Sequence, residues 1–193
     1  MAFAKGKAYV VNRFSNDVSI INLADMTFGG AIRVDGREPV CAVTVGNYVY
    51  VACHLPDEST KEAVMSANVA VISASEDKLT KTLPLVNGSS GVKDICVSPD
   101  GKTVYVSHIV GRYAYPTTQL DRAWINSNCV SVVDTKSQTI TCSVLLDEVD
   151  KGAANPWGII VSTDGKYLCV ALSGLDEVML VDREKMHSRI DDV

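Results

Sequence analysis

Short runs of β-branched, aromatic and other apolar residues recur along this chain, separated by clusters of turn-forming residues. Such runs predict β-strands, and no long stretch shows the spacing of an amphipathic helix. Four runs resemble one another, three of them through a Tyr-Val step: residues 8–12, 49–52, 104–107 and 167–171. Each is followed by a run that ends in a polar or acidic residue: 17–22, 68–73, 129–134 and 177–182. The chain therefore contains an internal repeat.

Further strands flank this pair in each repeat. Apolar runs precede it at 40–45, 92–97 and 157–161, with a short equivalent at 1–4. Runs follow it at 28–34, 79–85 and 139–146, with a ragged equivalent at 187–193. The sequence thus predicts four-stranded antiparallel units, spanning about 1–34, 35–85, 86–146 and 147–193.

Tight turns precede the second strand of each unit. Two of them read Ser-Pro-Asp-Gly-Lys at 98–102 and Ser-Thr-Asp-Gly-Lys at 162–166, and shorter ones lie at 5–7 and 46–47. Proline presets φ for the first corner of a turn, and glycine adopts positive φ without strain. The turns are therefore consistent with hairpins.

Units of this kind cannot bury both faces alone, and their radial stacking is a β-propeller. We predict an all-β propeller with about four blades present, as part of a larger, seven-bladed ring. An antiparallel sandwich is the alternative, but it does not explain the regular repeat. An open stack leaves two blade faces uncovered, so self-association through the open blade edges is expected.

Composition and charge narrow the function. The net charge is -5 and no basic block or stripe occurs, which argues against non-specific nucleic-acid binding. No apolar run approaches the roughly 18 residues that a membrane span needs. Residues 1–5 lack the apolar core of a signal peptide, so the sequence taken alone indicates the cytosol.

The six cysteines leave two interpretations open. Five of them, Cys41, Cys96, Cys129, Cys142 and Cys169, lie in or beside apolar runs, where a thiol behaves as a small hydrophobic group. Buried free thiols are therefore expected, and a disulfide framework is the alternative. Neither C-x-x-C nor C-x-x-C-H occurs, which excludes a zinc ribbon and a covalently attached haem in this sequence.

The Tyr-Val strands, the turn at 98–102 and the strand at 129–134 resemble the YVTN-type β-propeller repeat family. Residues 108–113, 116–122 and 147–157 are similar to bacterial YVTN proteins whose propeller is joined to a dihaem cytochrome c peroxidase-like domain. The resemblance implies a periplasmic or cell-surface protein associated with a redox domain. This chain departs from that pattern in having no haem-binding motif, no signal sequence and few blades, so no peroxidase activity is assigned to it.

Topology predicts where a site would lie. In an up-and-down blade, the connection between the second and third strands opens on the same face as the connection to the next blade. The long connections 53–67, 86–91, 108–128 and 147–156 all fall on that face. Long connections in a compact domain are often functional, so this face is the expected binding surface.

Two histidines stand at the ends of second strands. His54 and His108 occupy comparable places in neighbouring units, from which two imidazoles could ligate a metal or a haem iron. The alternative is that each one hydrogen-bonds a loop carbonyl. Two histidines without an assured third ligand make a weak metal signal, so no cofactor is assigned to this chain, and haem is expected only in an associated domain.

The connection after His108 combines arginines with aromatic residues, a composition typical of interface anchors. The candidates are Arg112, Tyr113, Asp121, Arg122 and Trp124. Alternatively, Arg112 or Arg122 could pair with Asp121, Asp147 or Asp150 and only hold the connection in place.

A second group of candidates lies in the last long connection. Asp147 and Asp150 belong to an acidic cluster that is either a solvated turn or an oxygen-rich cation site, although the pattern of a dedicated calcium loop is absent. Asn155 is expected to cap the turn before Pro156. Trp157 enters an innermost strand, where it either packs or stacks on a ligand at the channel mouth.

No nucleophile elbow, phosphate loop or zinc-protease helix is present in the sequence. The absence of these motifs favours a non-enzymatic scaffold that docks a partner through its loop-bearing face. The resemblance implies that the scaffold belongs to an exported bacterial propeller and that the partner is a protein or a fused redox domain. A haem- or metal-binding propeller that contributes to redox catalysis is the alternative. A cell-surface spacer without a small-molecule site is a third.

Overall fold

Nearly all of the regular structure is β-strand. The computed structural model describes residues 1–56, 63–112 and 125–192. The first sheet holds β1 (Ala2–Ala4), β2 (Lys7–Asn12), β3 (Asp17–Asn22) and β4 (Thr27–Arg33). The second holds β5 (Arg37–Val45), β6 (Tyr48–Leu55), β7 (Asn68–Ser73) and β8 (Lys78–Pro84).

The third and fourth sheets follow the same order. The third holds β9 (Ser89–Val97), β10 (Thr103–Gly111), β11 (Asn126–Asp134) and β12 (Thr139–Leu145). The fourth holds β13 (Pro156–Val161), β14 (Tyr167–Leu172) and β15 (Glu177–Asp182), and the helix α1 (Arg183–Asp191) comes directly after it. Each strand pairs antiparallel with the next one in its own sheet.

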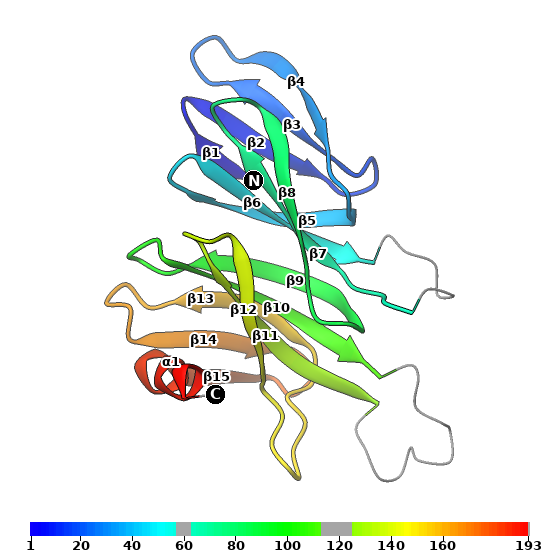
Figure 1. The fold of residues 1–193 in the computed structure, drawn as a ribbon, viewed down its shortest axis with the longest axis vertical. Helices are drawn as coiled ribbons and strands as arrows, with labels where there is room; N and C mark the ends of the chain where they lie inside the picture. The colour runs from blue at the N-terminus through cyan, green and yellow to red at the C-terminus, as the bar shows by residue number, and fades with distance from the viewer. Residues whose placement is uncertain (57–62, 113–124, 193) are drawn as a thin grey trace.

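The sheets succeed one another along the molecule, with the first and the fourth at opposite ends (Figure 1). Each is an up-and-down meander, and successive sheets pack face to face. This is the arrangement of β-propeller blades, and the predicted fold class is confirmed. We number the blades one to four in chain order.

The expected fourth strand at 187–193 is wrong, because α1 begins immediately after β15. The Asp182 carboxylate accepts a hydrogen bond from the Lys185 backbone N–H and so caps the helix. Glu184 in the first turn and Arg189 in the last turn both suit the helix dipole. Met186 is buried and anchors α1 to the core between the third and fourth blades.

The core is divided into three layers, one between each pair of successive blades. Side chains alternate between the two faces of each strand, so a third strand packs its second and fourth residues against the following blade. In blade one these residues are Val18 and Ile20, and in blade two they are Val69 and Val71, all with exposures of 2% or less. The repeat in the sequence is therefore a repeat of core positions.

The two long turns fold in the same way because their sequences are alike. Ser98 Oγ donates to Asp100 Oδ1 at 2.6 Å, and the Lys102 N–H donates to the same oxygen at 3.1 Å. Ser162 and Asp164 form the corresponding hydrogen bond at 2.7 Å. These side chains supply hydrogen-bond partners within the turn itself, which suits a structural role for the two turns.

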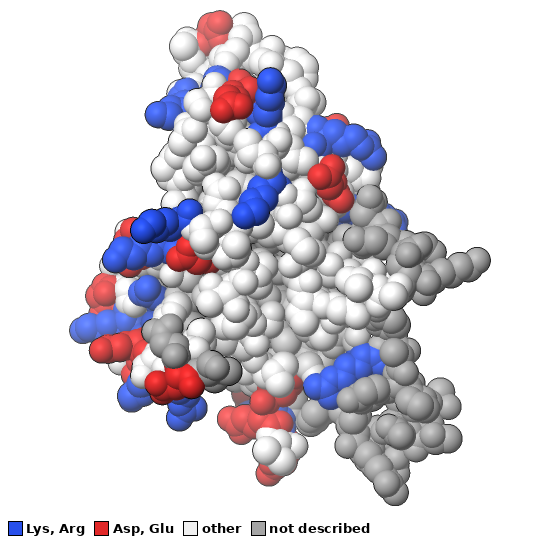
Figure 2. Space-filling model, in the orientation of Figure 1, with Lys and Arg blue, Asp and Glu red and all other residues white. Residues whose placement is uncertain are grey.

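Charge is not segregated on the face shown in Figure 2. Basic and acidic side chains are mixed along its edges, and much of its middle is uncharged. This view therefore shows no basic stripe of the kind that nucleic-acid binding uses. No helix among the described residues has the length and apolar content needed to cross a membrane.

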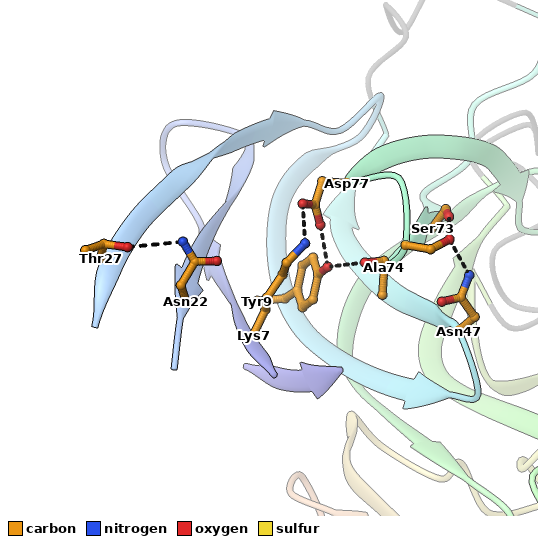
Figure 3. Close-up of polar contacts among 9 residues, drawn as sticks. Lys7, Tyr9, Asn22, Thr27, Asn47, Ser73, Ala74 and Asp77 are labelled. Carbon is orange, nitrogen blue, oxygen red and sulfur yellow. Dashed lines mark hydrogen bonds and ion pairs between the residues drawn. The ribbon is translucent and has the colours of Figure 1, made fainter. Parts of the chain in front are cut away.

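The tyrosine of each Tyr-Val strand links its blade to the next one. Tyr9 of β2 donates its hydroxyl to Asp77 Oδ1 in the following blade at 2.7 Å, and Lys7 Nζ lies 2.5 Å from Asp77 Oδ2 (Figure 3). Burial and the neighbouring Asp77 carboxylate both raise the pKa of Tyr9. The pKa of Asp77 is lowered: burial opposes the shift, but the hydrogen bonds from Lys7 and Tyr9 outweigh it.

Two further tyrosines repeat this contact. Tyr50 reaches the Thr135 carbonyl oxygen at 3.4 Å, a long contact, in the turn between β11 and β12. Tyr105 accepts a hydrogen bond from Arg183 Nε at 2.7 Å and lies 2.6 Å from His187 Nε2. In the fourth blade α1 thus takes the place of the turn that receives the tyrosine in the second and third blades.

Candidate functional site

The long connections leave the blades on one side of the molecule. Strands β6 and β10, which carry two of these connections, both end on that side (Figure 1). The connections between successive blades open there too. We call this surface the loop face and the opposite surface, which carries the tight turns, the turn face.

His108 is fully buried near the loop-face end of β10. Its Nε2 accepts a hydrogen bond from Ser131 Oγ at 2.7 Å, and Ser131 Oγ lies 2.8 Å from Ser143 Oγ. Its Nδ1 faces the carbonyl oxygen of Ile109 at 3.4 Å, so the neutral tautomer with the proton on Nδ1 fits both contacts. Burial lowers the pKa of His108 to about 4, so the imidazole is neutral near pH 7.

His54 is half-buried, and its Nδ1–H donates to the Val92 carbonyl oxygen of β9 at 2.6 Å. The bond joins the second blade to the innermost strand of the third. His54 follows Tyr50 by four residues, whereas His108 follows Tyr105 by three. Because side chains alternate along a strand, the two histidines point to opposite faces of their strands. Both therefore approach the layer between the second and third blades, one from each side.

Each histidine has a protein hydrogen-bond partner, but the partners are groups of neighbouring strands, Val92 of β9 and Ser131 of β11, and not the loop carbonyls of the structural alternative. Among residues 1–56, 63–112 and 125–192, no three His, Cys, Asp or Glu side chains form a group that could hold a metal ion. All six cysteines lie in these ranges, and none of them forms a disulfide. Burial raises the pKa of Cys41, Cys96 and Cys129 to about 12, so these thiols are protonated at neutral pH.

Asp147 fastens the last interblade connection to β11. Its carboxylate accepts three hydrogen bonds of 2.7 to 2.8 Å, from the Asn128 N–H, the Asn128 side-chain amide and the Ala153 N–H. Asp150 is exposed, three residues further on. Of the two carboxylates singled out in the sequence, Asp147 holds the backbone and Asp150 faces solvent.

Asn155 continues the same network. Its N–H donates to Asn128 Oδ1 at 3.0 Å, and its side-chain amide donates to Ser173 Oγ at 2.8 Å. It adopts φ of 59°, a left-handed conformation that asparagine tolerates better than most residues. Asp147, Asn128, Asn155 and Ser173 thus form one polar cluster that joins blades three and four at the loop face.

Trp157 lies at the start of β13 and is 50% exposed. Lys93 Nζ of β9 lies 4.3 Å from the centre of its ring, a cation–π contact between two innermost strands. The Trp157 carbonyl oxygen accepts a hydrogen bond from Ser107 Oγ at 2.7 Å. The backbone of Trp157 is thus fixed, while its ring remains accessible beside a lysine.

The remaining candidates belong to the connection after β10. Arg112 lies at its start, and its N–H donates to the Ile125 carbonyl oxygen at 2.8 Å, which closes the base of the connection. Tyr113, Asp121, Arg122 and Trp124 lie outside the described residues. Their proposed role as interface anchors stays a prediction.

Among the exposed apolar side chains on the loop face that were not singled out in the sequence, two are almost fully exposed. Phe14, between β2 and β3, is 87% exposed, and Val149, between β12 and β13, is 94% exposed. Beside Phe14, Arg13 makes a two-pronged contact with the Glu38 carboxylate, with distances of 2.9 and 2.7 Å. An apolar residue inside a polar connecting segment is the signal that would have found both.

The blade order and the meander topology define the protein as one built from β-propeller blades. Comparisons with known proteins agree. A stretch of 102 residues is 26% identical to hydrazine synthase subunit beta of Kuenenia stuttgartiensis, and this match covers 53% of the chain and 26% of that protein. No protein-family model matches the chain.

A solved structure described as Kuenenia stuttgartiensis hydrazine synthase superimposes with a TM-score of 0.81. The superposition covers 97% of this chain and 53% of the other, at 19% sequence identity. At that identity the likeness establishes the fold. The chain spans about a quarter of the curated relative and about half of the solved one.

Proposed function

We propose that this chain is a non-catalytic propeller module of an exported, periplasmic or surface assembly, and that its loop face docks a partner protein or a redox domain. Any haem in such an assembly belongs to the partner. The blades act as a rigid frame that holds the docking residues at fixed positions.

The observation that carries this proposal is that apolar side chains on the loop face are exposed to solvent, while residues close to them in the same connections are held by hydrogen bonds or ion pairs. Val149 is 94% exposed, yet it lies between Asp147 and Ala153, which the polar cluster fixes to β11. Phe14 is 87% exposed and lies next to the Arg13–Glu38 ion pair. A side chain that is already ordered loses little entropy when it is buried by a partner.

The similarity to a protein named as subunit beta supports the same function. A subunit works beside other chains, and this chain matches that relative over about half of its own length. The redox-associated YVTN proteins that the sequence resembles suggest that the partner carries the reactive group.

Site-directed photo-crosslinking tests the proposal in cells of the native source. A photoreactive phenylalanine analogue is placed at Phe14 or Val149 on the loop face, and at Met26 on the turn face as the control. Met26 is 71% exposed, which makes it a fair match in accessibility. We expect a discrete adduct with one partner from both loop-face positions and none from Met26.

The adduct also tests the redox assignment. Mass spectrometry identifies the crosslinked protein, and absorbance of the purified adduct shows whether that protein carries haem. Equal crosslinking from the loop face and from Met26, or no adduct at either loop-face position, would contradict loop-face docking. We do not propose haem or metal binding at His54 and His108, because both imidazoles are engaged by protein groups.

A further inference from the structure

The outer edge of β15 differs from the equivalent edges in the other blades. In blades one to three the third strand pairs on both sides, with the second strand and with β4, β8 or β12. In the described part of the chain β15 pairs with β14 alone. Its other side therefore offers a row of backbone N–H and C=O groups that a further strand can pair with.

A groove runs along this edge (Figure 1 shows β15 with α1 beside it). Its volume is about 820 Å³, and β12, β15 and α1 form its walls. Apolar side chains of all three elements line it, including Cys142, Val144, Met179, Met186 and Ile190. α1 borders this space, and its Met186 and Ile190 also pack against the core between blades three and four.

The fourth strands of blades one to three, β4, β8 and β12, show what fits such an edge. Each is seven residues long, with an apolar residue at its second position and another at its sixth: Phe28 and Ile32, Leu79 and Leu83, Ile140 and Val144. A register shift lies between these two positions in every case. The shift turns the second residue toward the preceding blade and the sixth toward the following one, as Leu79 and Leu83 show.

The same geometry can be transferred to β15. Val181 corresponds to Ile21, Ile72 and Val133, which lie beside the register shift. An added strand would place its second residue beside Val181, in the groove among Cys142, Val144 and Met179. Its sixth residue would lie beside Val178, which is 66% exposed in the structure.

We propose that the β15 edge is a strand-docking site. It takes an extended segment of a partner polypeptide, about seven residues long, with apolar side chains at positions two and six, as the fourth strand of blade four. Main-chain hydrogen bonds to β15 supply affinity, and the groove between β12 and α1 selects the apolar side chain at position two. This site lies apart from the loop face and does not rest on the function proposed above.

The test uses the intact chain and a peptide that copies Lys78–Pro84, the β8 strand, labelled with fluorescein. Fluorescence anisotropy measures binding to the wild-type chain. We expect saturable binding that weakens by more than about tenfold in Met179→Asp, which puts a charge into the groove. Ile160→Asp is the matched control: Ile160 lies in the same blade, is 64% exposed and does not line the groove, so it should leave affinity within about twofold.

A second peptide tests the main-chain pairing without changing the protein. N-methylation of alternate amides removes the N–H groups that face β15 while the side chains stay the same, and we expect binding to be lost. Failure of the unmodified peptide to bind wild-type chain, or equal binding of the methylated peptide, would overturn the proposal. Dimers that form without peptide and dissociate in Met179→Asp would place a second copy of the chain at this edge and would also overturn it.

Discussion

At the scale of single residues, His108 shows how a buried polar group ties stability to pH. The folded protein holds the imidazole neutral, with a pKa of about 4, whereas the unfolded chain has the ordinary value of 6.5. Between these two values the unfolded state binds a proton that the folded state does not. Stability must therefore fall as pH falls through this window and be fully present above it.

We expect the free energy of unfolding to decrease by about 2 kcal/mol between pH 7.5 and pH 5 because of His108 alone. Urea denaturation at a series of pH values measures this slope. His108→Asn keeps a polar side chain and removes the titrating group, so its slope should be shallower by that amount. Parallel curves for the two proteins would mean that the pKa of His108 is the same in the folded and unfolded states.

The interblade tyrosine Tyr9 provides a second test at this scale. Tyr9→Phe keeps the ring and removes the hydroxyl that donates to Asp77, so the hydrogen bond is lost and part of the Asp77 carboxylate is left without a donor. We expect a loss of about 1–2 kcal/mol in chemical denaturation. Tyr48→Phe is the control, because Tyr48 also lies in the second strand of a blade, β6, but is 36% exposed. An equal loss of unfolding free energy in Tyr48→Phe would show that the interblade hydrogen bond of Tyr9 adds no stability of its own.

At the scale of elements, the connection from β12 to β13 depends on one carboxylate. Asp147 accepts hydrogen bonds from two backbone N–H groups and from the Asn128 amide, so Asp147→Ala leaves three donors to find other partners. We expect a loss of about 3 kcal/mol in stability and faster hydrogen exchange at the Asn128 and Ala153 amides. Asp150→Ala, at an exposed position in the same connection, should cost less than about 0.5 kcal/mol. Unchanged exchange at Ala153 in Asp147→Ala would contradict this account.

Strand positions could be predicted well from the sequence because each repeat presents the same core pattern. The bounds predicted for β3, β7 and β15 agree with the structure, since the apolar alternation begins and ends at polar residues in all three strands. α1 was missed because the repeat suggested a strand there, whereas the Asp182 cap and a buried Met186 favour a helix. Local capping outweighed the repeat at that point.

The candidate site was less predictable because a side chain's role depends on contacts between blades. His54 and His108 look equivalent in sequence, but an offset of one residue sends them to opposite faces of their strands. Asp147 looks like a solvated acid or a cation ligand, and its actual partners lie 19 and 6 residues away along the chain. Such partners are fixed by sheet register, which strand patterns alone do not give.

At the scale of the whole molecule, blades one and four each expose an apolar face. In the inner blades the equivalent face is covered by a neighbouring blade. On the fourth blade, Val178 is 66% exposed, whereas its counterparts Val18, Val69 and Val130 are at most 1% exposed. On the first blade, Phe3 and Phe28 lie on one cross-strand row and are 59% and 66% exposed. These surfaces have the composition of a blade–blade core, which explains the expectation of self-association.

The face of the fourth blade gives the sharpest test of that expectation, because charge placed there blocks packing without touching a buried position. Ile160 and Val178 are 64% and 66% exposed, and the double variant Ile160→Lys with Val178→Lys should fold normally. We expect the wild-type chain to form larger species as its concentration rises, and the double variant to remain smaller in light scattering. Met26→Lys with Val149→Lys adds the same charge at exposed apolar sites away from this face, so it separates the loss of packing from general charge repulsion. Equal suppression by both double variants would show that net charge, and not the open blade face, controls association.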